Sequence, residues 1–159
     1  MIFRKWLAEY IGTAALVCVV VGSGIMGTNL SKDSGVALLI NAFSTIFALA
    51  LLILIIAPIS GAHFNPAVSL VQVLRREMNA VEFLSFVSAQ IAGAITGAVI
   101  ANVMFDLQAI QISTNDRVTT GTLVGEVIAT AGLITVIFVL VARSQEKLIP
   151  VGVAAWIGS

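Results

Sequence analysis

The residues best suited to hold a polar molecule stand together in the decapeptide GAHFNPAVSL, at positions 61–70. Asn65 is a good N-cap, and Pro66 suits the first turn of a helix, where its missing N–H is no loss. The pair therefore predicts a short helix over 66–74, which ends before two arginines. The N-terminus of such a helix presents unpaired N–H groups and the positive end of the helix dipole, so it repels cations.

The residues just before this helix are candidates to line a passage for a solute. Their carbonyls would form a row of hydrogen-bond acceptors, and Gly61 and Ala62 are small enough to leave the passage open. A neutral solute could exchange water for these carbonyls on one side and for the Asn65 amide at the centre. The candidate lining residues in this stretch are Gly61, Ala62, His63 and Phe64.

The decapeptide lies between long apolar segments. Of the 159 residues, 59% are hydrophobic and 10% are charged, and the mean hydropathy is +1.09. Soluble domains have about a quarter of their residues charged, so a loop between two soluble helices is disfavoured. Four apolar runs come near the ~20 residues that span a bilayer, and a fifth, from 148, covers half a span. The four runs are 7–26, 36–59, 81–104 and 122–142. We therefore expect an all-α, multi-pass membrane protein.

The distribution of basic residues predicts that the decapeptide does not cross the membrane. With the N-terminus in the cytoplasm, the positive-inside rule is met by most of the lysines and arginines. The inner set is Arg4, Lys5, Arg75, Arg76, Arg143 and Lys147, and the outer set is Lys32 and Arg117. Lys32 is assigned to the outer side and Arg75 to the inner side, and the span 36–59 alone carries the chain across between them. The segment after Asn65 must therefore return to the inner side, from which it entered the membrane. Non-helical backbone at membrane depth is tolerated only when protein buries it or when it lines a watery cavity, so a pore or a substrate site is predicted.

An internal repeat supports a transport architecture. EYIGTAAL, at 9–16, recurs as EVIATAGL, at 126–133, with five of eight residues identical and an offset of 117. The two copies enter the membrane from opposite sides, as in inverted repeats. Glu9 and Glu126 could serve in a proton relay, in an ion site or as hydrogen-bonding buttresses of a re-entrant loop. Since neither has a second acid at helical spacing, as a relay or an ion site would need, we favour the buttress, with Gln90 in a similar role or in a simple interhelical hydrogen bond.

Other residues indicate packing rather than chemistry. Gly93 and Gly97 form a G-x-x-x-G pattern, which favours close approach of membrane helices. Cys18 is the only cysteine and should be a small buried residue. His63 is the only histidine and has no neighbouring acid or thiol, so an enzyme is the least favoured class. We expect no catalytic residue, cofactor, metal or nucleic-acid partner.

The stretch ISGAHFNPAVS, at 59–69, resembles the first Asn-Pro-Ala signature of the major intrinsic proteins, the aquaporins and aquaglyceroporins of bacterial type. AEYIGT at 8–13, AQIAGA at 89–94 and the pair at 125–126 extend the resemblance along nearly the whole chain. The resemblance implies a right-handed bundle of six spans and two re-entrant half-helices, arranged as inverted repeats. It also implies homotetramers in which each protomer has its own pore for water or small neutral solutes.

The resemblance also implies roles for single residues. Asn65, Pro66 and Ala67 resemble the pore signature, and His63 resembles the histidine whose backbone helps line the inner vestibule. Glu9 and Glu126 resemble the paired buttressing glutamates. Thr45, twenty positions before the asparagine, matches a residue of the outer constriction, where water-selective members usually have an aromatic side chain.

The side chain at position 45 affects the expected solute. A threonine there suggests a wider or more polar constriction that admits glycerol-like solutes. The chain also looks similar to bacterial members found beside arsenic-resistance genes, which adds arsenous acid as a candidate.

The repeat offset divides the chain into three parts. We expect a first repeat over 1–104, an outer connecting loop over 105–121 and a partial second repeat over 122–159. An offset of 117 from Asn65 places a second Asn-Pro-Ala near position 182, beyond Ser159. We therefore expect the second repeat to be incomplete and the chain alone not to conduct selectively.

Two alternatives to a channel in a bacterial inner membrane remain. A secondary transporter with broken helices would also show inverted repeats, but its uptake should depend on protons or other ions. A non-conducting membrane fragment would give no flux under any gradient.

Overall fold

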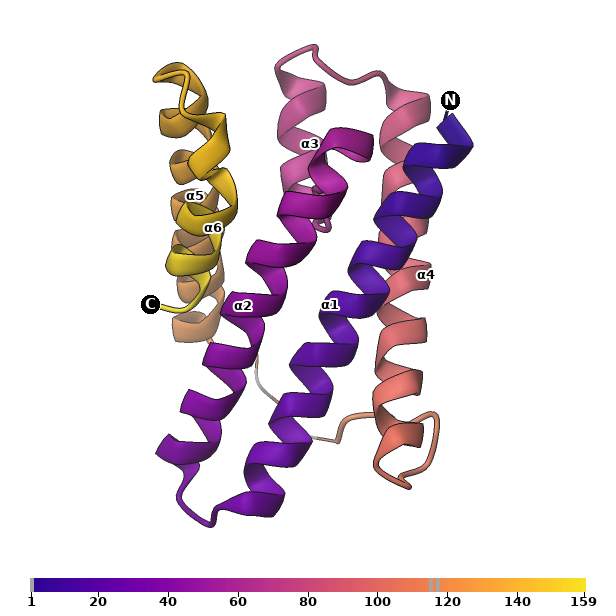
Figure 1. The fold of residues 1–159 in the computed structure, drawn as a ribbon, viewed down its shortest axis with the longest axis vertical. Helices are drawn as coiled ribbons and strands as arrows, with labels where there is room; N and C mark the ends of the chain where they lie inside the picture. Colours follow the sequence, from indigo (N-terminus) through magenta and orange to yellow (C-terminus); the bar gives the residue numbers. More distant parts are fainter. Residues whose placement is uncertain (1, 115, 117) are drawn as a thin grey trace.

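The computed structural model describes residues 2–114, 116 and 118–159, which form helices and no strand. Four helices are long and apolar enough to cross a membrane. They are α1 (Ile2–Leu30), α2 (Ser34–Ser60), α4 (Ala80–Met104) and α5 (Thr120–Ala142). The short elements are α3 (Pro66–Leu74), η1 (Glu146–Leu148) and α6 (Ile149–Ile157). Figure 1 shows α3 beside the ends of α2 and α4, and α5 with α6 on the other side of α2.

The predicted segments agree with the observed helices. Each of the four apolar runs lies inside one long helix, and the predicted half-helix over 66–74 coincides with α3. Helices α1 and α5 run in opposite directions in Figure 1, as inverted repeats require. The division into 1–104, 105–121 and 122–159 stays a prediction, and Arg117, which we assigned to the outer loop, lies outside the described residues.

Helices α1 and α4 pack closely along their length because glycine leaves room for backbone. A Cβ atom at Gly93 would lie 2.5 Å from the carbonyl oxygen of Tyr10, and one at Gly97 would overlap the carbonyl oxygen of Ala14. The G-x-x-x-G prediction is therefore confirmed. Cys18 on α1 is half-buried rather than buried, because its Sγ lies near the end of the α1–α4 contact, 3.9 Å from the Sδ of Met104.

Local signals explain where α2 begins and ends. The Oδ1 of Asp33 accepts hydrogen bonds from the N–H groups of Gly35 (2.7 Å) and Val36 (3.1 Å), which caps the helix. At the other end, Gly61 adopts a left-handed φ of 95° and donates its N–H to the carbonyl of Ala57. A glycine in this conformation ends a helix at little steric cost, so the chain can turn toward α3.

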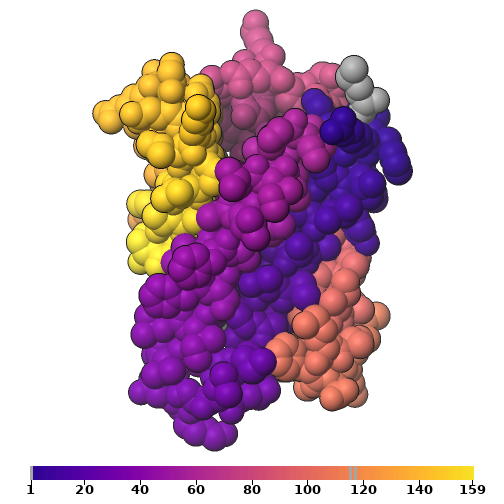
Figure 2. All heavy atoms as spheres, in the orientation of Figure 1, coloured from indigo at the N-terminus to yellow at the C-terminus, as the bar shows by residue number. Residues whose placement is uncertain are grey.

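Helix α6 packs against both α2 and α5. Figure 2 shows α2 crossing the front of the molecule between α6 and α1. Trp156 of α6 donates its Nε1–H to the carbonyl of Ala129 (2.9 Å), and its ring fills the space beside Gly132. Leu133 is the one buried residue among those described in α5, so most of the apolar surface of this helix is exposed.

Candidate functional site

The turn between α2 and α3 has an unusual backbone conformation. Gly61, Ala62 and Phe64 have positive φ angles of 95°, 51° and 48°. Residues other than glycine rarely adopt positive φ angles. Each such residue, here Ala62 and Phe64, destabilises the fold by about 1–3 kcal/mol, which contacts with the surroundings must offset. Residues 61–65 must therefore be held by contacts from other parts of the bundle.

The carboxylate of Glu9, on α1, supplies those contacts. Glu9 is 0% exposed. Its Oε1 accepts hydrogen bonds from the His63 N–H (3.0 Å) and the Ser60 hydroxyl (2.6 Å). Its Oε2 accepts from the Phe64 N–H (2.8 Å) and from Nε2 of Gln90 (2.9 Å). Because a buried charge is costly unless it is hydrogen-bonded, these four donors stabilise the carboxylate while it holds the loop.

Hydroxyl groups complete the network. The Ser60 oxygen accepts from the N–H of Ala62 (3.1 Å). Ser69, on α3, is 0% exposed; its Oγ accepts from Nε2 of Gln90 (3.1 Å) and lies 3.0 Å from Nδ1 of His63. Helices α1, α3 and α4 therefore meet the loop through a single cluster of polar groups.

In the loop, this network uses backbone N–H donors and leaves backbone carbonyl acceptors unused by the described residues. The N–H groups of residues 62–64 all bond to Glu9 or Ser60. Among the described residues, none donates a hydrogen bond to the carbonyls of 61–64. Asn65 uses Oδ1 to cap α3 through the N–H of Ala67 (2.7 Å), and its Nδ2 group makes no hydrogen bond within the described chain. The loop thus keeps several acceptors and one donor group unused.

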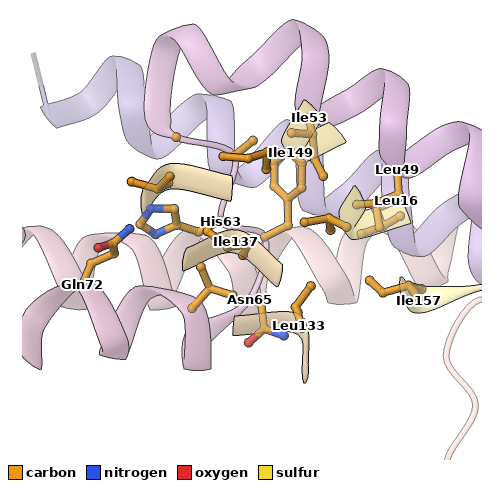
Figure 3. A pocket seen from close by; sticks show the side chains of 16 residues that line it. Leu16, Leu49, Ile53, His63, Asn65, Gln72, Leu133, Ile137, Ile149 and Ile157 are labelled. Carbon is orange, nitrogen blue, oxygen red and sulfur yellow. The ribbon is translucent and has the colours of Figure 1, made fainter. Parts of the chain in front are cut away.

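Residues 61–65 line a cavity of about 240 Å³. Figure 3 shows Asn65 and His63 on one side of it, with apolar side chains from α1, α2, α5 and α6 around the remainder. The labelled apolar residues are Leu16, Leu49, Ile53, Leu133, Ile137, Ile149 and Ile157. The cavity therefore has a polar side, formed by the loop, and is lined mostly by apolar side chains elsewhere.

The aromatic ring of Phe64 anchors the loop to α1. A Cβ atom at Gly12 would overlap this ring, so only glycine leaves the space that the ring occupies. Gly12 lies three residues after Glu9, on the same side of the helix. One turn of α1 therefore holds the loop by hydrogen bonds and by packing.

His63 lies in the loop, outside the four long helices. Its ring packs against Phe86, with ring centroids 5.1 Å apart. Burial lowers the pKa of His63 below its ordinary value of 6.5, while the negative charge of Glu9 opposes this shift. A lowered pKa favours the neutral ring near pH 7, so His63 adds no net charge to the cavity.

Two predicted site residues lie apart from this cluster. Thr45 does not line the cavity; its Oγ1 is buried and has no hydrogen-bond partner among the described residues, and Leu49, one turn further along α2, contacts the cavity instead. Glu126 is exposed and forms no hydrogen bond with the described residues, because the first part of α5 faces away from the bundle. The structure therefore brings together Glu9, Gln90 and residues 61–67, and the roles of Thr45 and Glu126 stay predictions.

Sequence reasoning missed Ser69 and Gln72. Both follow Asn65 at helical spacing, four and seven residues later, so they share its face of α3. This spacing of polar residues within an apolar helix was the available signal. Among the described residues, no group of three His, Cys, Asp or Glu side chains could hold a metal ion.

The fold and the site together define an integral membrane protein that crosses the membrane several times and holds a half-helix inside its bundle. The family model described as "Major intrinsic protein" matches residues 1–158, and the chain belongs to that family.

Relatives agree with this assignment. Aquaglyceroporin AqpS of Rhizobium meliloti is 41% identical over 143 residues, which cover 90% of this chain and 61% of AqpS. Aquaporin A of Dictyostelium discoideum is 34% identical over 96 residues, which cover 60% of this chain and 34% of that protein. The chain thus spans less than two thirds of either relative. The crystal structure of the aquaglyceroporin from Plasmodium falciparum has the same fold, with a TM-score of 0.76 at 24% identity over 99% of this chain and 69% of that protein.

Proposed function

We propose that the complete gene product containing this chain is a channel for passive flux of water and small uncharged solutes. The observation that carries the proposal is the loop beside the cavity: the N–H groups of residues 62–64 are bound to Ser60 and Glu9, while the carbonyls of 61–64 and Nδ2 of Asn65 have no hydrogen-bond partner among the described residues. A solute with hydroxyl groups can exchange water for these groups at little cost. The names of the relatives, an aquaglyceroporin and an aquaporin, support the same class of solute.

The charge of the site favours neutral solutes over ions. None of the described residues that line the cavity is Asp, Glu, Lys or Arg. The N-terminus of α3 directs the positive end of its dipole toward Asn65, which disfavours cations. Glycerol-like molecules are the proposed solutes, with arsenous acid as a second neutral candidate that carries hydroxyl groups.

The remaining assignments rest on the resemblance and on charge. We assign the protein to the inner membrane of a bacterium, with its N-terminus in the cytoplasm, and we propose a homotetramer. Asn65, Pro66 and Ala67 form the pore signature, Thr45 belongs to the outer constriction, and Glu126 braces a second loop. The activity is passive transport and not catalysis.

Solute flux into proteoliposomes tests the proposal. The complete gene product is reconstituted, and swelling in a glycerol gradient is followed by light scattering, with and without a protonophore. A channel gives faster swelling than protein-free vesicles in both conditions. Swelling that depends on a proton gradient would support a secondary transporter instead, and swelling no faster than in protein-free vesicles would support a non-conducting protein.

A further inference from the structure

Gln72 lies two turns of α3 beyond Asn65 and borders two sizeable cavities, besides a gap of about 10 Å³ against α5. The first is the central cavity described above. The second, of about 170 Å³, lies at the C-terminal end of α3, where Lys5, Glu77 and Glu82 also line it. His63 and Gln72 are the two described residues that border both cavities. Figure 3 shows the carboxamide of Gln72 on the side of the His63 ring, and we refer to this pair of side chains, which borders both spaces, as the neck.

The carboxamide of Gln72 is not used by the fold. Its Oε1 is buried and has no hydrogen-bond partner among the described residues. A buried acceptor without a partner is unfavourable, and such groups in native proteins need an explanation. The last torsion of a glutamine side chain has a broad range, so a small rotation turns the oxygen into either cavity.

Each charged side chain that lines the second cavity has an ion-pair partner. Nζ of Lys5 lies 2.6 Å from Oε1 of Glu82, and Nη2 of Arg75 lies 2.7 Å from Oε1 of Glu77. Paired charges leave little net field at this cavity. The Glu9 carboxylate, which bonds the N–H of His63, has no ion-pair partner among the described residues and is instead stabilised by four hydrogen bonds. The chemistry that remains is one amide acceptor, one amide donor group and one imidazole, which fits a neutral molecule with hydroxyl groups.

We infer that Gln72 and His63 form a solute-binding neck on the inner side of the Asn-Pro-Ala loop, where Gln72 accepts a hydrogen bond from a solute hydroxyl. Gln72 thereby favours solutes with hydroxyl groups over those that cannot donate. The identity of the solute rests on the proposed function; the existence of the neck rests on the two cavities and the unpartnered oxygen.

Side-chain amide NMR of the complete gene product in lipid bilayers tests the neck without requiring flux. Glutamine is labelled with 15N, glycerol is the probe, and Gln72→Leu assigns the Gln72 signal. We expect glycerol to shift this signal. Gln90 is the internal control, because its Nε2 is already bonded to Glu9 and Ser69 and should not respond. Sucrose at matched osmolality, a solute much larger than glycerol, is the control and should leave both signals in place.

Flux measurements on the same samples distinguish the solute-binding neck from the proposed channel function. Gln72→Leu should lower the ratio of glycerol to water permeability by about tenfold, the effect of one lost hydrogen bond. A Gln72 signal that does not move with glycerol would overturn the neck even if the protein conducts glycerol. A signal that moves in a protein without flux would support the neck and contradict the proposed channel. Since the NMR readout uses the wild-type side chain, Gln72→Met can assign the signal if the leucine variant does not fold.

Discussion

Glu9 is the single residue on which the geometry of the loop depends most. It provides both oxygens of one carboxylate to two backbone N–H groups, one hydroxyl and one amide. Together with Ser60, which accepts from the Ala62 N–H, these bonds use the N–H groups of residues 62–64, while the carbonyls of 61–64 have no hydrogen-bond partner among the described residues. The Glu9 carboxylate therefore both stabilises the strained backbone of the loop and determines which polar groups the loop presents to the cavity.

Glu9→Gln should destabilise the protein strongly. A glutamine has one acceptor oxygen in place of two, so some of the four donors would lose their partner in a buried site. We expect a loss of about 2–4 kcal/mol in the free energy of unfolding, measured by denaturant in detergent. Glu146→Gln, in the exposed element η1, is the matched control and should change stability little. Equal stability of the two variants would show that Glu9 does not hold the loop.

His63 should make stability depend on pH. Because the pKa of His63 is lowered in the folded state, the unfolded chain binds a proton at pH values where the folded chain does not. The stability contributed by the neutral ring is complete above pH 6.5 and is lost as the pH falls from 6.5 through the lowered pKa. Since His63 is the only histidine, His63→Gln should flatten this part of the stability curve. An unchanged slope would contradict the lowered pKa.

The sequence predicted the main residues of the site but not all of its contacts. The sequence could identify Glu9, Gln90 and Asn65, because a charged or amide side chain inside an apolar segment is unfavourable unless it has a structural or functional role. Ser69 and Gln72 were missed because a serine or a glutamine near a helix end also fits a membrane surface. Only the folded chain shows that Ser69 is completely buried and that Gln72 borders two cavities.

At the scale of elements, α1 and α4 form the frame that carries Glu9 and Gln90 to the loop. Their close approach depends on Gly93 and Gly97, which face the backbone of α1. The half-helix α3 then attaches at its far end, where the guanidinium of Arg75 lies 4.5 Å from the ring centre of Phe138 on α5. The position of the loop therefore follows from the packing of helices that are distant in sequence.

Gly97→Ala should push α1 and α4 apart. The added Cβ would overlap the carbonyl oxygen of Ala14, and backbone cannot move aside as a flexible side chain can. We expect a loss of about 1–3 kcal/mol in unfolding free energy. Gly125→Ala is the matched control, since a Cβ there meets nothing within 4 Å; it should be neutral or slightly stabilising. A Gly97→Ala variant as stable as the Gly125→Ala variant would contradict the close packing.

The helices themselves were predictable from length and composition. Apolar runs of membrane length, and an Asn-Pro pair that starts a helix, were sufficient to place α1 to α5 within a few residues. The attachment of α6 was not predictable, because it depends on a Trp156 ring that fits beside Gly132. Such a fit between side chains of different helices leaves no periodic pattern in the sequence.

At the scale of the whole molecule, the ends of the helices define two sides of the membrane. The Lys5–Glu82 ion pair places the beginnings of α1 and α4 at the same end of the bundle. Lys32, between α1 and α2, belongs to the opposite end. The half-helix must therefore enter and leave from the side of Lys5. A second Asn-Pro-Ala near position 182 stays a prediction, which the gene sequence beyond the codon for Ser159 can check.

Sided labelling tests this topology. In a Cys18→Ser background, an impermeant thiol reagent should label Lys32→Cys in intact cells and Glu77→Cys only after lysis. The unmodified background should stay unlabelled. Labelling of both positions from the same side would mean that residues 61–74 cross the membrane.

Water permeability of proteoliposomes, measured by stopped-flow light scattering, tests most directly whether the loop held by Glu9 forms the conducting path. The wild-type gene product and Glu146→Gln should both raise permeability well above that of protein-free vesicles. Glu9→Gln, at equal amounts of folded protein, should lose most of this increase. A Glu9→Gln variant that conducts as well as the wild type would contradict the proposed path.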